Sequence, residues 1–329
     1  MTSDTTPAAA ASGQPPCPVC GNAANYEYSG RDLMYDLRAR YDYFQCPACA
    51  CVFQHPMPDM ATIATFYPDD YMVFDQEQGK RTRDIGPLRL GLLRRMRGYA
   101  HLSVALPYRL LAALISPFQQ LTTPAWEGGG RMLDVGCGNG RFLNSMRSFG
   151  WAVEGVEFSE AGVTAARLSE LKVHHGDLAS ANFADNSFDL VTARHVIEHI
   201  PQPHPFMAEL VRILRPGGRL VIETPCSTAL GRQWFNTHWY ANDVPRHLFL
   251  FSPDNLERIG TGHGLQKTAL LLETTPKIFL NSLDYIIGNR GRPSKKIAWR
   301  RFLARTYVRL AERRGRGDTM QMTFTKPTA

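Results

Sequence analysis

The chain has 329 residues, of which 44% are hydrophobic, and its formal net charge is +7. This length and apolar content are typical of a folded protein with a real core and exclude a wholly disordered chain. No apolar run reaches the roughly 18 residues that a membrane-spanning helix needs. Residues 1–15 lack a basic stretch followed by an apolar one and are interpreted as a disordered leader, so we expect a cytoplasmic protein.

The positive charge is concentrated in two segments. Residues 80–109 hold eight Lys or Arg and one acid, and residues 290–316 hold eleven and one. The rest of the chain is therefore net acidic. Any anionic partner would meet these two segments and not the remainder.

Residues 16–58 are cysteine-rich and contain two C-x-x-C pairs separated by 25 residues. Four thiolates at this spacing match a tetrahedral zinc ribbon, and in a cytosolic chain zinc is favoured over disulfides. The residues between the pairs suit a hairpin, and Cys51 and His55 are further donors that could replace one ligand. The predicted zinc ligands are Cys17, Cys20, Cys46 and Cys49.

Residues 59–126 are predicted to be a helical, basic linker, and from residue 127 onward short apolar runs alternate with helical segments. This alternation predicts an α/β fold, a parallel sheet with helices on both faces. The predicted helices cover residues 141–149, 160–171 and 206–214, with a later one that starts near Pro253 and is capped by Ser252. Strands are expected around residues 131–136, 152–158, 172–177, 187–195, 219–225 and 320–326.

The first of these strands ends in the glycine-rich turn LDVGCGNG. Open α/β sheets bind ligands at this turn, where glycines let a ligand approach the backbone. A dinucleotide site would read G-x-G-x-x-G, whereas Gly136, Gly138 and Gly140 are spaced G-x-G-x-G. Asp134 precedes them, and a carboxylate suits a cationic cofactor better than a pyrophosphate.

Two further acids follow the next two predicted strands. Glu157 is placed to accept both hydroxyls of a ribose, and Asp177 to accept from an exocyclic adenine amine. Three acids at strand ends beside a glycine turn fit adenosine joined to a positively charged tail. The alternative is that the glycines only turn the chain and the acids only cap helices.

The blocks LDVGCGNG, VEFS, GDL, FDLVTARHVIEHIPQP and LRPGGRLVIETP, within residues 130–225, resemble the class I S-adenosylmethionine-dependent methyltransferases, in particular their ubiquinone-biosynthesis-like branch. The resemblance implies a Rossmann-like seven-stranded methyltransferase sheet over residues 127–329, interrupted by a basic helical insertion at 276–317. It also implies S-adenosylmethionine as cofactor. The implied cofactor-binding residues are Asp134, Gly136, Cys137, Gly138, Asn139 and Gly140 for the methionine part, Glu157 for the ribose, Asp177 and Leu178 for the adenine, and Phe158 and His195 nearby.

If the acceptor is a hydroxyl, a general base helps the transfer, and His199 and His247 are the candidates. The block NDVPRHLFLFSP around His247 resembles a segment that helps wall the acceptor pocket in this branch. A structural, hydrogen-bonded histidine is the alternative for His247. Cys137 and Cys226 are interpreted as packing residues.

His195, Glu198 and His199 stand at i, i+3 and i+4, which would place them on one face of a helix. Two imidazoles and a carboxylate can bind a divalent ion. Some quinone-type O-methyltransferases use Glu in the first place, where this chain has His. A second metal besides zinc is therefore disfavoured.

Near the end of the chain, Arg301, Arg305, Arg309 and Arg313 form one row of a predicted amphipathic helix. Its predicted apolar face consists of Trp299, Phe302, Leu303, Thr306 and Leu310. Packing of this face on the core is the first interpretation. The sharper hypothesis is peripheral contact with an anionic membrane, at the inner membrane surface, which would suit a lipid-linked acceptor.

The leading prediction is thus a methyltransferase that acts, on oxygen, on a small molecule, a sugar or a glycoconjugate. Bacterial methyltransferases of sugar and glycoconjugate pathways resemble residues 17–71. One alternative is an RNA methyltransferase that uses the zinc module and the basic segments to bind RNA; against it, the fourth strand ends in ARHVIEH and not in an Asn-Pro-Pro-Tyr-like motif. The other is a zinc-dependent interaction protein with a vestigial cofactor pocket.

Overall fold

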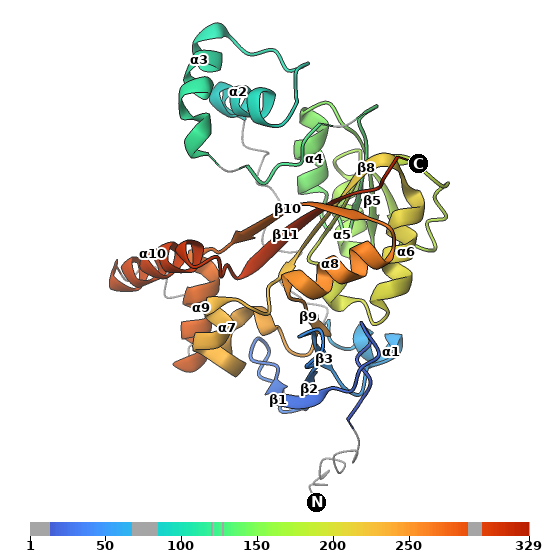
Figure 1. The fold of residues 1–329 in the computed structure, drawn as a ribbon, viewed down its shortest axis with the longest axis vertical. Helices are drawn as coiled ribbons and strands as arrows, with labels where there is room; N and C mark the ends of the chain where they lie inside the picture. Colours follow the sequence, from blue (N-terminus) through green and yellow to red (C-terminus); the bar gives the residue numbers. More distant parts are fainter. Residues whose placement is uncertain (1–13, 68–84, 120, 127, 289–297, 329) are drawn as a thin grey trace, which may run out of the picture.

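The structure, a computed structural model, describes residues 14–67, 85–119, 121–126, 128–288 and 298–328 (Figure 1). Most of the predicted leader lies outside these residues. Among the described helices, none combines the length and the apolar character needed to cross a membrane.

A seven-stranded sheet forms the centre of the molecule, in the order β10-β11-β8-β7-β4-β5-β6. Only β11 is antiparallel to its neighbours, β8 and β10. The predicted doubly covered α/β sheet is confirmed, with β4 in a central position, so the turn after β4 lies where strand order reverses. The strands are β4 (Arg131–Val135), β5 (Ala152–Glu157), β6 (Lys172–His175), β7 (Phe188–Arg194), β8 (Leu214–Pro225), β10 (Gln266–Glu273) and β11 (Thr319–Thr325).

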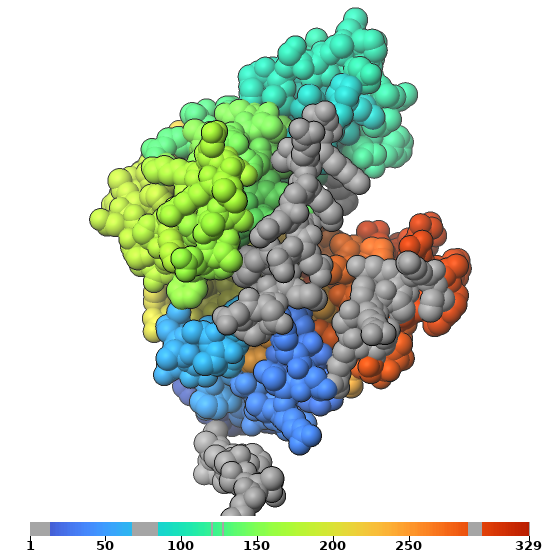
Figure 2. All heavy atoms as spheres, turned by 180° about the vertical axis from the view of Figure 1, so that it is seen from behind, coloured from blue at the N-terminus to red at the C-terminus, as the bar shows by residue number. Residues whose placement is uncertain are grey.

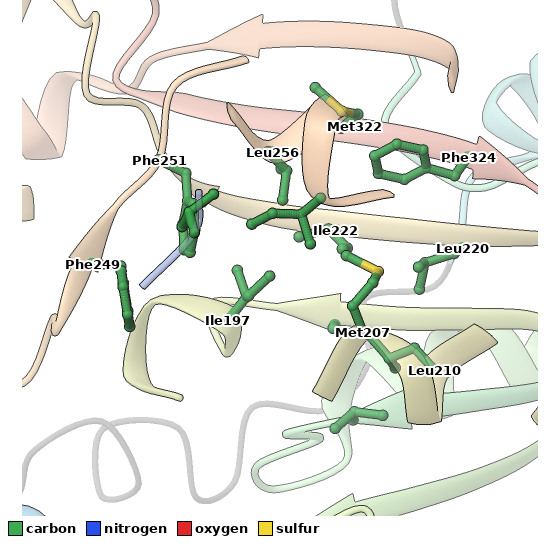
Figure 3. Close-up of a cluster of buried hydrophobic side chains, with 14 of the residues drawn as sticks. Ile197, Met207, Leu210, Leu220, Ile222, Phe249, Phe251, Leu256, Met322 and Phe324 are labelled. Atoms are coloured by element: carbon green, nitrogen blue, oxygen red, sulfur yellow. The ribbon is translucent and has the colours of Figure 1, made fainter. Parts of the chain in front are cut away.

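Alternate residues of the central strands are buried on opposite faces of this sheet. On one face, Met132 and Leu190 pack with α4 (Arg141–Ser148) and α5 (Glu160–Arg167). On the other face, α6 (Pro203–Ile213) and α8 (Pro253–Gly262) cover the sheet. Figure 3 shows this second layer, in which the following side chains meet: Ile197, Met207, Leu210, Leu220, Ile222, Leu256, Met322 and Phe324. As predicted, α8 starts at Pro253 with Ser252 as its cap.

The N-terminal cysteine module is a small antiparallel sheet made of β1 (Asn25–Arg31), β2 (Arg40–Gln45) and β3 (Val52–Gln54). The predicted hairpin between the cysteine pairs is β1–β2. The sheet has a fourth strand, β9 (Phe249–Leu250), which comes from the distant segment around His247. Figure 1 shows β9 beside β3. The module is therefore joined to the rest of the protein by backbone pairing as well as by side chains.

The remaining elements are helices. They are α1 (Met60–Ala64), α2 (Pro87–Met96), α3 (Leu106–Ile115), α7 (Leu230–Phe235), α9 (Pro276–Ile286) and α10 (Ala298–Arg313), with short 3-10 helices at Ser116–Phe118, Ile197–His199, Asn236–His238 and Tyr240–Asn242.

The predicted apolar face of α10 is wrong as a packing face except at Leu310, which is partly buried against the core. Trp299 and Phe302 are 58% and 67% exposed. The buried face instead carries Arg300, Ala304, Tyr307 and Ala311. Arg300 is paired with buried Asp284 at 2.7 Å, and the Tyr307 hydroxyl donates to Asp318. Paired polar groups thus help to dock this helix, and Trp299, Phe302 and Leu303 stay outside. The basic row Arg301, Arg305, Arg309 and Arg313 is also exposed.

A buried ion cluster joins the cysteine module to the larger sheet domain. Arg246, which is 1% exposed, contacts Asp32 of the module at 2.7 Å and Asp243 at 2.8 Å. Arg246→Met would leave both carboxylates buried without their cation. We expect a loss of about 3 kcal/mol in the free energy of unfolding, measured by urea denaturation.

The matched control is Arg212→Met, because Arg212 pairs with Glu209 and Asp185 at the surface. An exposed ion pair contributes no more than about 1 kcal/mol. Equal losses for the two variants would contradict a special role for the buried cluster.

Candidate functional site

A large open cavity lies along the carboxyl ends of β4, β5 and β7. One wall is the glycine turn with Glu157 and Asp177, and another contains His195, His199 and His247. The topology therefore brings the predicted cofactor residues and the predicted catalytic residues to one cavity.

The glycines of the turn have left-handed backbone conformations, with φ of +70° at Gly136, +53° at Gly138 and +73° at Gly140. A Cβ on Gly140 would lie 2.2 Å from the Leu171 Cδ1 atom, so this glycine permits close packing behind the turn. At Gly138 a Cβ would meet nothing within 4 Å, because this residue faces the cavity. The backbone of the turn is thus open to a ligand at Gly138.

Glu157 shapes the same turn from the end of β5. Its carboxylate accepts from the Gly138 amide at 2.7 Å and from the Ser159 amide at 2.8 Å, one on each oxygen. A carboxylate oxygen can accept a second hydrogen bond, so both oxygens can still receive a ribose hydroxyl. Gly162 lies against this side chain, where a Cβ would be 3.0 Å from the Glu157 Cγ atom.

Asp177 and Leu178 follow β6 at the edge of the cavity. The Asp177 side chain accepts from the Ser180 amide at 2.7 Å. Hydrogen bonds from the backbone and the hydroxyl of Ser180 lower the pKa of Asp177. Asp177 is exposed and Leu178 is buried. This pair offers an ionised acceptor beside an apolar surface, as an adenine ring requires. Phe158, 65% exposed, lines the cavity next to Glu157.

Asp134 differs in position from the other predicted acids. It is 2% exposed, accepts from the Thr192 hydroxyl, and is absent from the cavity lining. Burial raises its pKa to about 6. The structure therefore places this carboxylate behind the turn, where it can act on a cationic ligand only through its charge.

The other residues of the turn also divide between lining and packing. Asn139 lines the cavity and accepts from the Arg141 amide at 3.2 Å. The Cys137 side chain is turned inward against Gly155, as expected for a packing residue. Cys226 is fully buried as well.

His195 does not share a helix face with Glu198 and His199, so that prediction is wrong. His195 has a φ of +53°, and only Ile197–His199 form a short 3-10 helix. The His195 ring bridges two carboxylates, with Nδ1 at 3.2 Å from Glu198 and Nε2 at 3.4 Å from Glu223. Burial opposes the charged ring, but these two partners raise the pKa of His195.

His199 and His247 lie side by side, with ring centroids 4.8 Å apart. In each ring Nδ1 donates to a backbone carbonyl: His199 to Arg246 at 2.9 Å, and His247 to Ala241 at 2.8 Å. Since a carbonyl only accepts, each neutral ring carries its lone pair on Nε2. Burial lowers the pKa of His247 to about 4, which makes it a weak base and leaves His199 as the better candidate.

Glu198, His199 and His247 offer ligand atoms within 4.8 Å of one another. This set replaces the predicted group that included His195. The Glu198 oxygens are already engaged, one by His195 and the other by the Thr224 hydroxyl at 2.9 Å. Burial tends to raise the pKa of Glu198, but His195 lowers it to about 2. The carboxylate thus holds the His195 ring, and each of its oxygens keeps a further lone pair.

The four predicted zinc ligands, Cys17, Cys20, Cys46 and Cys49, form one cluster with all sulfur atoms within 4.8 Å of one another. The Sγ atoms are 3.7 Å apart in Cys17–Cys49 and 3.5 Å apart in Cys20–Cys46. Four sulfur atoms about 2.3 Å from a zinc ion would be about 3.8 Å apart in a regular tetrahedron. The cluster therefore fits zinc, and Cys51, although buried nearby, is not needed.

Residues 107–270 match the family model described as a methyltransferase domain. The chain belongs to the class I S-adenosylmethionine-dependent methyltransferases.

Among the curated proteins that this chain resembles is the ubiquinone biosynthesis O-methyltransferase of Aromatoleum aromaticum, 36% identical over 103 residues, which are 29% of this chain and 44% of that protein. The protein of the same name from Nitrosococcus oceani is 29% identical over 174 residues, 50% of this chain and 62% of that one. The chain thus spans less than half of the Aromatoleum relative's length.

Solved structures are similar to this chain at lower identity. An S-adenosylmethionine-dependent methyltransferase from Archaeoglobus fulgidus is 20% identical with a TM-score of 0.46, covering 66% of this chain and 94% of that one. Phosphoethanolamine N-methyltransferase 2 from Haemonchus contortus is 22% identical with a TM-score of 0.42, covering 67% and 53%.

The sequence-based prediction missed the part of the methyltransferase cavity that the N-terminal residues build. Met34, Met60, Ile63 and Tyr67 line the same cavity as the glycine turn. The Tyr67 hydroxyl lies 3.0 Å from the His199 Nδ1 atom. No spacing in the sequence signals this contact, because it depends on how the cysteine module docks.

Proposed function

We propose that this protein transfers a methyl group from S-adenosylmethionine to an oxygen atom of a small-molecule, sugar or lipid-linked glycoconjugate acceptor. The observation that carries the proposal is that a single cavity joins the Glu157 turn to the His199–Tyr67 pair. One side of this cavity suits the cofactor, and the other presents a base.

The cofactor side supports S-adenosylmethionine through the exposed Gly138 backbone and the ribose-binding capacity of Glu157. Asp177 and Phe158 would hold the adenosine. When bound, this cofactor supplies a methyl group that its sulfonium has already activated, so alignment of the acceptor matters most.

The acceptor side carries several apolar side chains among polar ones such as Asp243 and Lys277. Met34 faces it from the N-terminal module, Met60 and Ile63 from α1, and Ile278 from α9. These side chains would hold an acceptor with an apolar body and exclude water. His199 would take the proton of the acceptor hydroxyl on Nε2, with its ring oriented by the Arg246 carbonyl and Tyr67. The names of the relatives, O-methyltransferases of ubiquinone biosynthesis, support oxygen as the methylated atom.

The module's role in this proposal depends on zinc. We propose that the cluster of Cys17, Cys20, Cys46 and Cys49 binds one structural zinc ion, which stabilises a sheet too small to fold on its own apolar contacts. The zinc would thereby fix Tyr67 and the apolar wall beside His199 indirectly.

The test of the function is incubation of the protein with labelled S-adenosylmethionine and a fractionated cell extract. We expect label in a small-molecule or lipid fraction. Label in RNA would favour the RNA methyltransferase, which the relatives reported above do not support. Failure to bind S-adenosylmethionine at all would favour an interaction protein with a vestigial pocket.

Glu157→Gln tests the cofactor side separately. Losing charge-assisted hydrogen bonds costs about 1.5–3 kcal/mol. We expect the Kd for S-adenosylmethionine, measured by calorimetry, to rise about 10- to 100-fold. The control is Glu154→Gln in the same strand, because Glu154 pairs with Arg131 and Lys172 away from the cavity. Equal affinities of the two variants would contradict the ribose assignment.

We also propose a cytoplasmic location with peripheral contact at the inner membrane surface. The support is that Trp299, Phe302 and Leu303 are exposed on α10 beside Arg301 and Arg305. An interfacial helix combines such apolar and basic groups. If the protein did not bind liposomes at low salt, the proposed membrane contact would be refuted.

A further inference from the structure

A second surface, far from α10 in the sequence, is formed by the pair of helices α2 and α3. Figure 1 shows this pair projecting from the large sheet beyond α4. Figure 2, which views the molecule from the opposite side, shows the pair as a protrusion. Its base is fixed to the domain. The Trp151 Nε1 atom donates to the Tyr99 hydroxyl at 3.0 Å, and the Trp126 and Trp151 rings are 4.8 Å apart.

One face of α3 packs against α2. Ala112 is fully buried there, and a Cβ on Gly91 of α2 would lie 3.0 Å from the Ala112 Cβ atom and from the Tyr108 carbonyl oxygen. The two helices therefore approach closely through small residues. This contact fixes which face of α3 is turned outward.

The outward face of α3 is apolar. Leu106, Leu110 and Leu114 stand at i, i+4 and i+8, and they are 62%, 63% and 72% exposed. Phe118, just beyond α3, is 85% exposed. By helical rotation this row is centred opposite Ala112. Single exposed apolar residues are ordinary, but a continuous row on one protruding helix marks an interaction surface.

The charge around this row indicates the partner. Residues 85–126 contain five arginines and no Asp or Glu. Arg89, Arg95 and Arg109 are exposed, and Arg109 flanks the apolar row on α3. A second copy of the chain would bring the same positive charge to the contact, which disfavours self-association through it. An anionic lipid surface offers both opposite charge and an apolar layer.

We propose that the outward face of α3 inserts into the surface of an anionic lipid bilayer. Leu106, Leu110, Leu114 and Phe118 would enter the boundary between headgroups and acyl chains, while the neighbouring arginines contact phosphate groups. A helix of ten residues is about 15 Å long and lies in this boundary without crossing the bilayer. This inference does not rest on the proposed reaction, since it uses no residue of the cavity.

The test is flotation of the full-length protein with vesicles of pure phosphatidylcholine, or of phosphatidylcholine with 30% phosphatidylglycerol, at low and at physiological salt. We expect binding to the anionic vesicles that weakens with salt. The double variant Leu110→Glu/Leu114→Glu changes exposed positions to a good helix former, so the fold should persist. Its partition coefficient should fall at least tenfold.

Two matched variants decide the result. Leu37→Glu alters an exposed leucine of the cysteine module, 49% exposed, and should change binding less than twofold. Trp299→Glu/Phe302→Glu alters α10 alone. Because α3 is intact in this variant, the protein should still bind the anionic vesicles in part, through the face that the α3 variant disrupts. Thermal melting and the Kd for S-adenosylmethionine, unchanged in all variants, would confirm that they are folded.

The proposal is overturned if the wild-type protein does not float with anionic vesicles at low salt, or if the α3 variant binds them as well as the wild type. It is also overturned if the wild type sediments as a dimer and the α3 variant as a monomer in analytical ultracentrifugation. In that case the face is an interface between copies of the chain.

Discussion

Removal of the metal from the cysteine cluster is expected to abolish methyl transfer while leaving S-adenosylmethionine binding nearly intact. A structural zinc contributes about 10 kcal/mol or more to the folding of small zinc domains. Its loss should open the sheet β1–β3 and release Tyr67 and the apolar wall at Met34 and Met60. The glycine turn and Glu157 belong to the large sheet and should remain in place.

The experiment compares Cys46→Ser with Cys226→Ser. Cys226 is buried outside the cluster, so this control should keep one zinc per chain and most of its activity. Cys46→Ser should lose the zinc, measured by elemental analysis, and all detectable transfer, with a change in the cofactor Kd of less than about fivefold. A metal-free wild-type protein with full activity would contradict a structural zinc.

His199→Ala is expected to lower kcat by a factor of about 10² to 10⁴, the usual contribution of a general base. The reason is that burial lowers the pKa of its neighbour His247 to about 4, which leaves His199 as the better base of the two. The cofactor Kd should stay within about twofold, because His199 contacts Tyr67 and Arg246 and not the glycine turn.

Tyr67→Phe should give a smaller loss in kcat, since the Arg246 carbonyl still orients the ring. The control is His263→Gln at the end of α8, where the ring contacts His204 and lies outside the cavity. If His199→Ala kept more than a tenth of the activity, His199 would not be the base. If it lost cofactor binding as well, its role would be structural.

The sheet and its glycine turn could be predicted from sequence, because strands that are buried on both faces are rich in apolar residues. Residues 188–193, for example, are all buried, although Asp189 and Thr192 interrupt the apolar residues. The acids at the strand ends follow from the same topology. The four cysteines were predictable since zinc binding imposes local spacing. Each of these signals lies within a few residues.

Other features depend on tertiary contacts that no local pattern encodes. The hydrophobic pattern of α10 pointed to the wrong face, because its true face is docked by Arg300 with Asp284 and Tyr307 with Asp318. His195 left the expected helix face through a left-handed backbone conformation that holds its ring between two carboxylates. Polar groups can be buried when they are paired, and a pattern of apolar residues in the sequence does not predict which polar groups pair.

The pairing of β3 with β9 bears on the order in which the protein folds. Val52 and Phe53 pair with Leu250 and Phe249, nearly 200 positions further along the chain. The two C-x-x-C pairs can come together as soon as they have been synthesised. Their sheet, however, lacks its fourth strand, β9, until β4 to β8 have been synthesised as well. Contacts of such sequence separation form late. The edge of β3 is therefore open during synthesis, and a chain arrested before residue 249 should be more prone to aggregate through this edge than the complete chain.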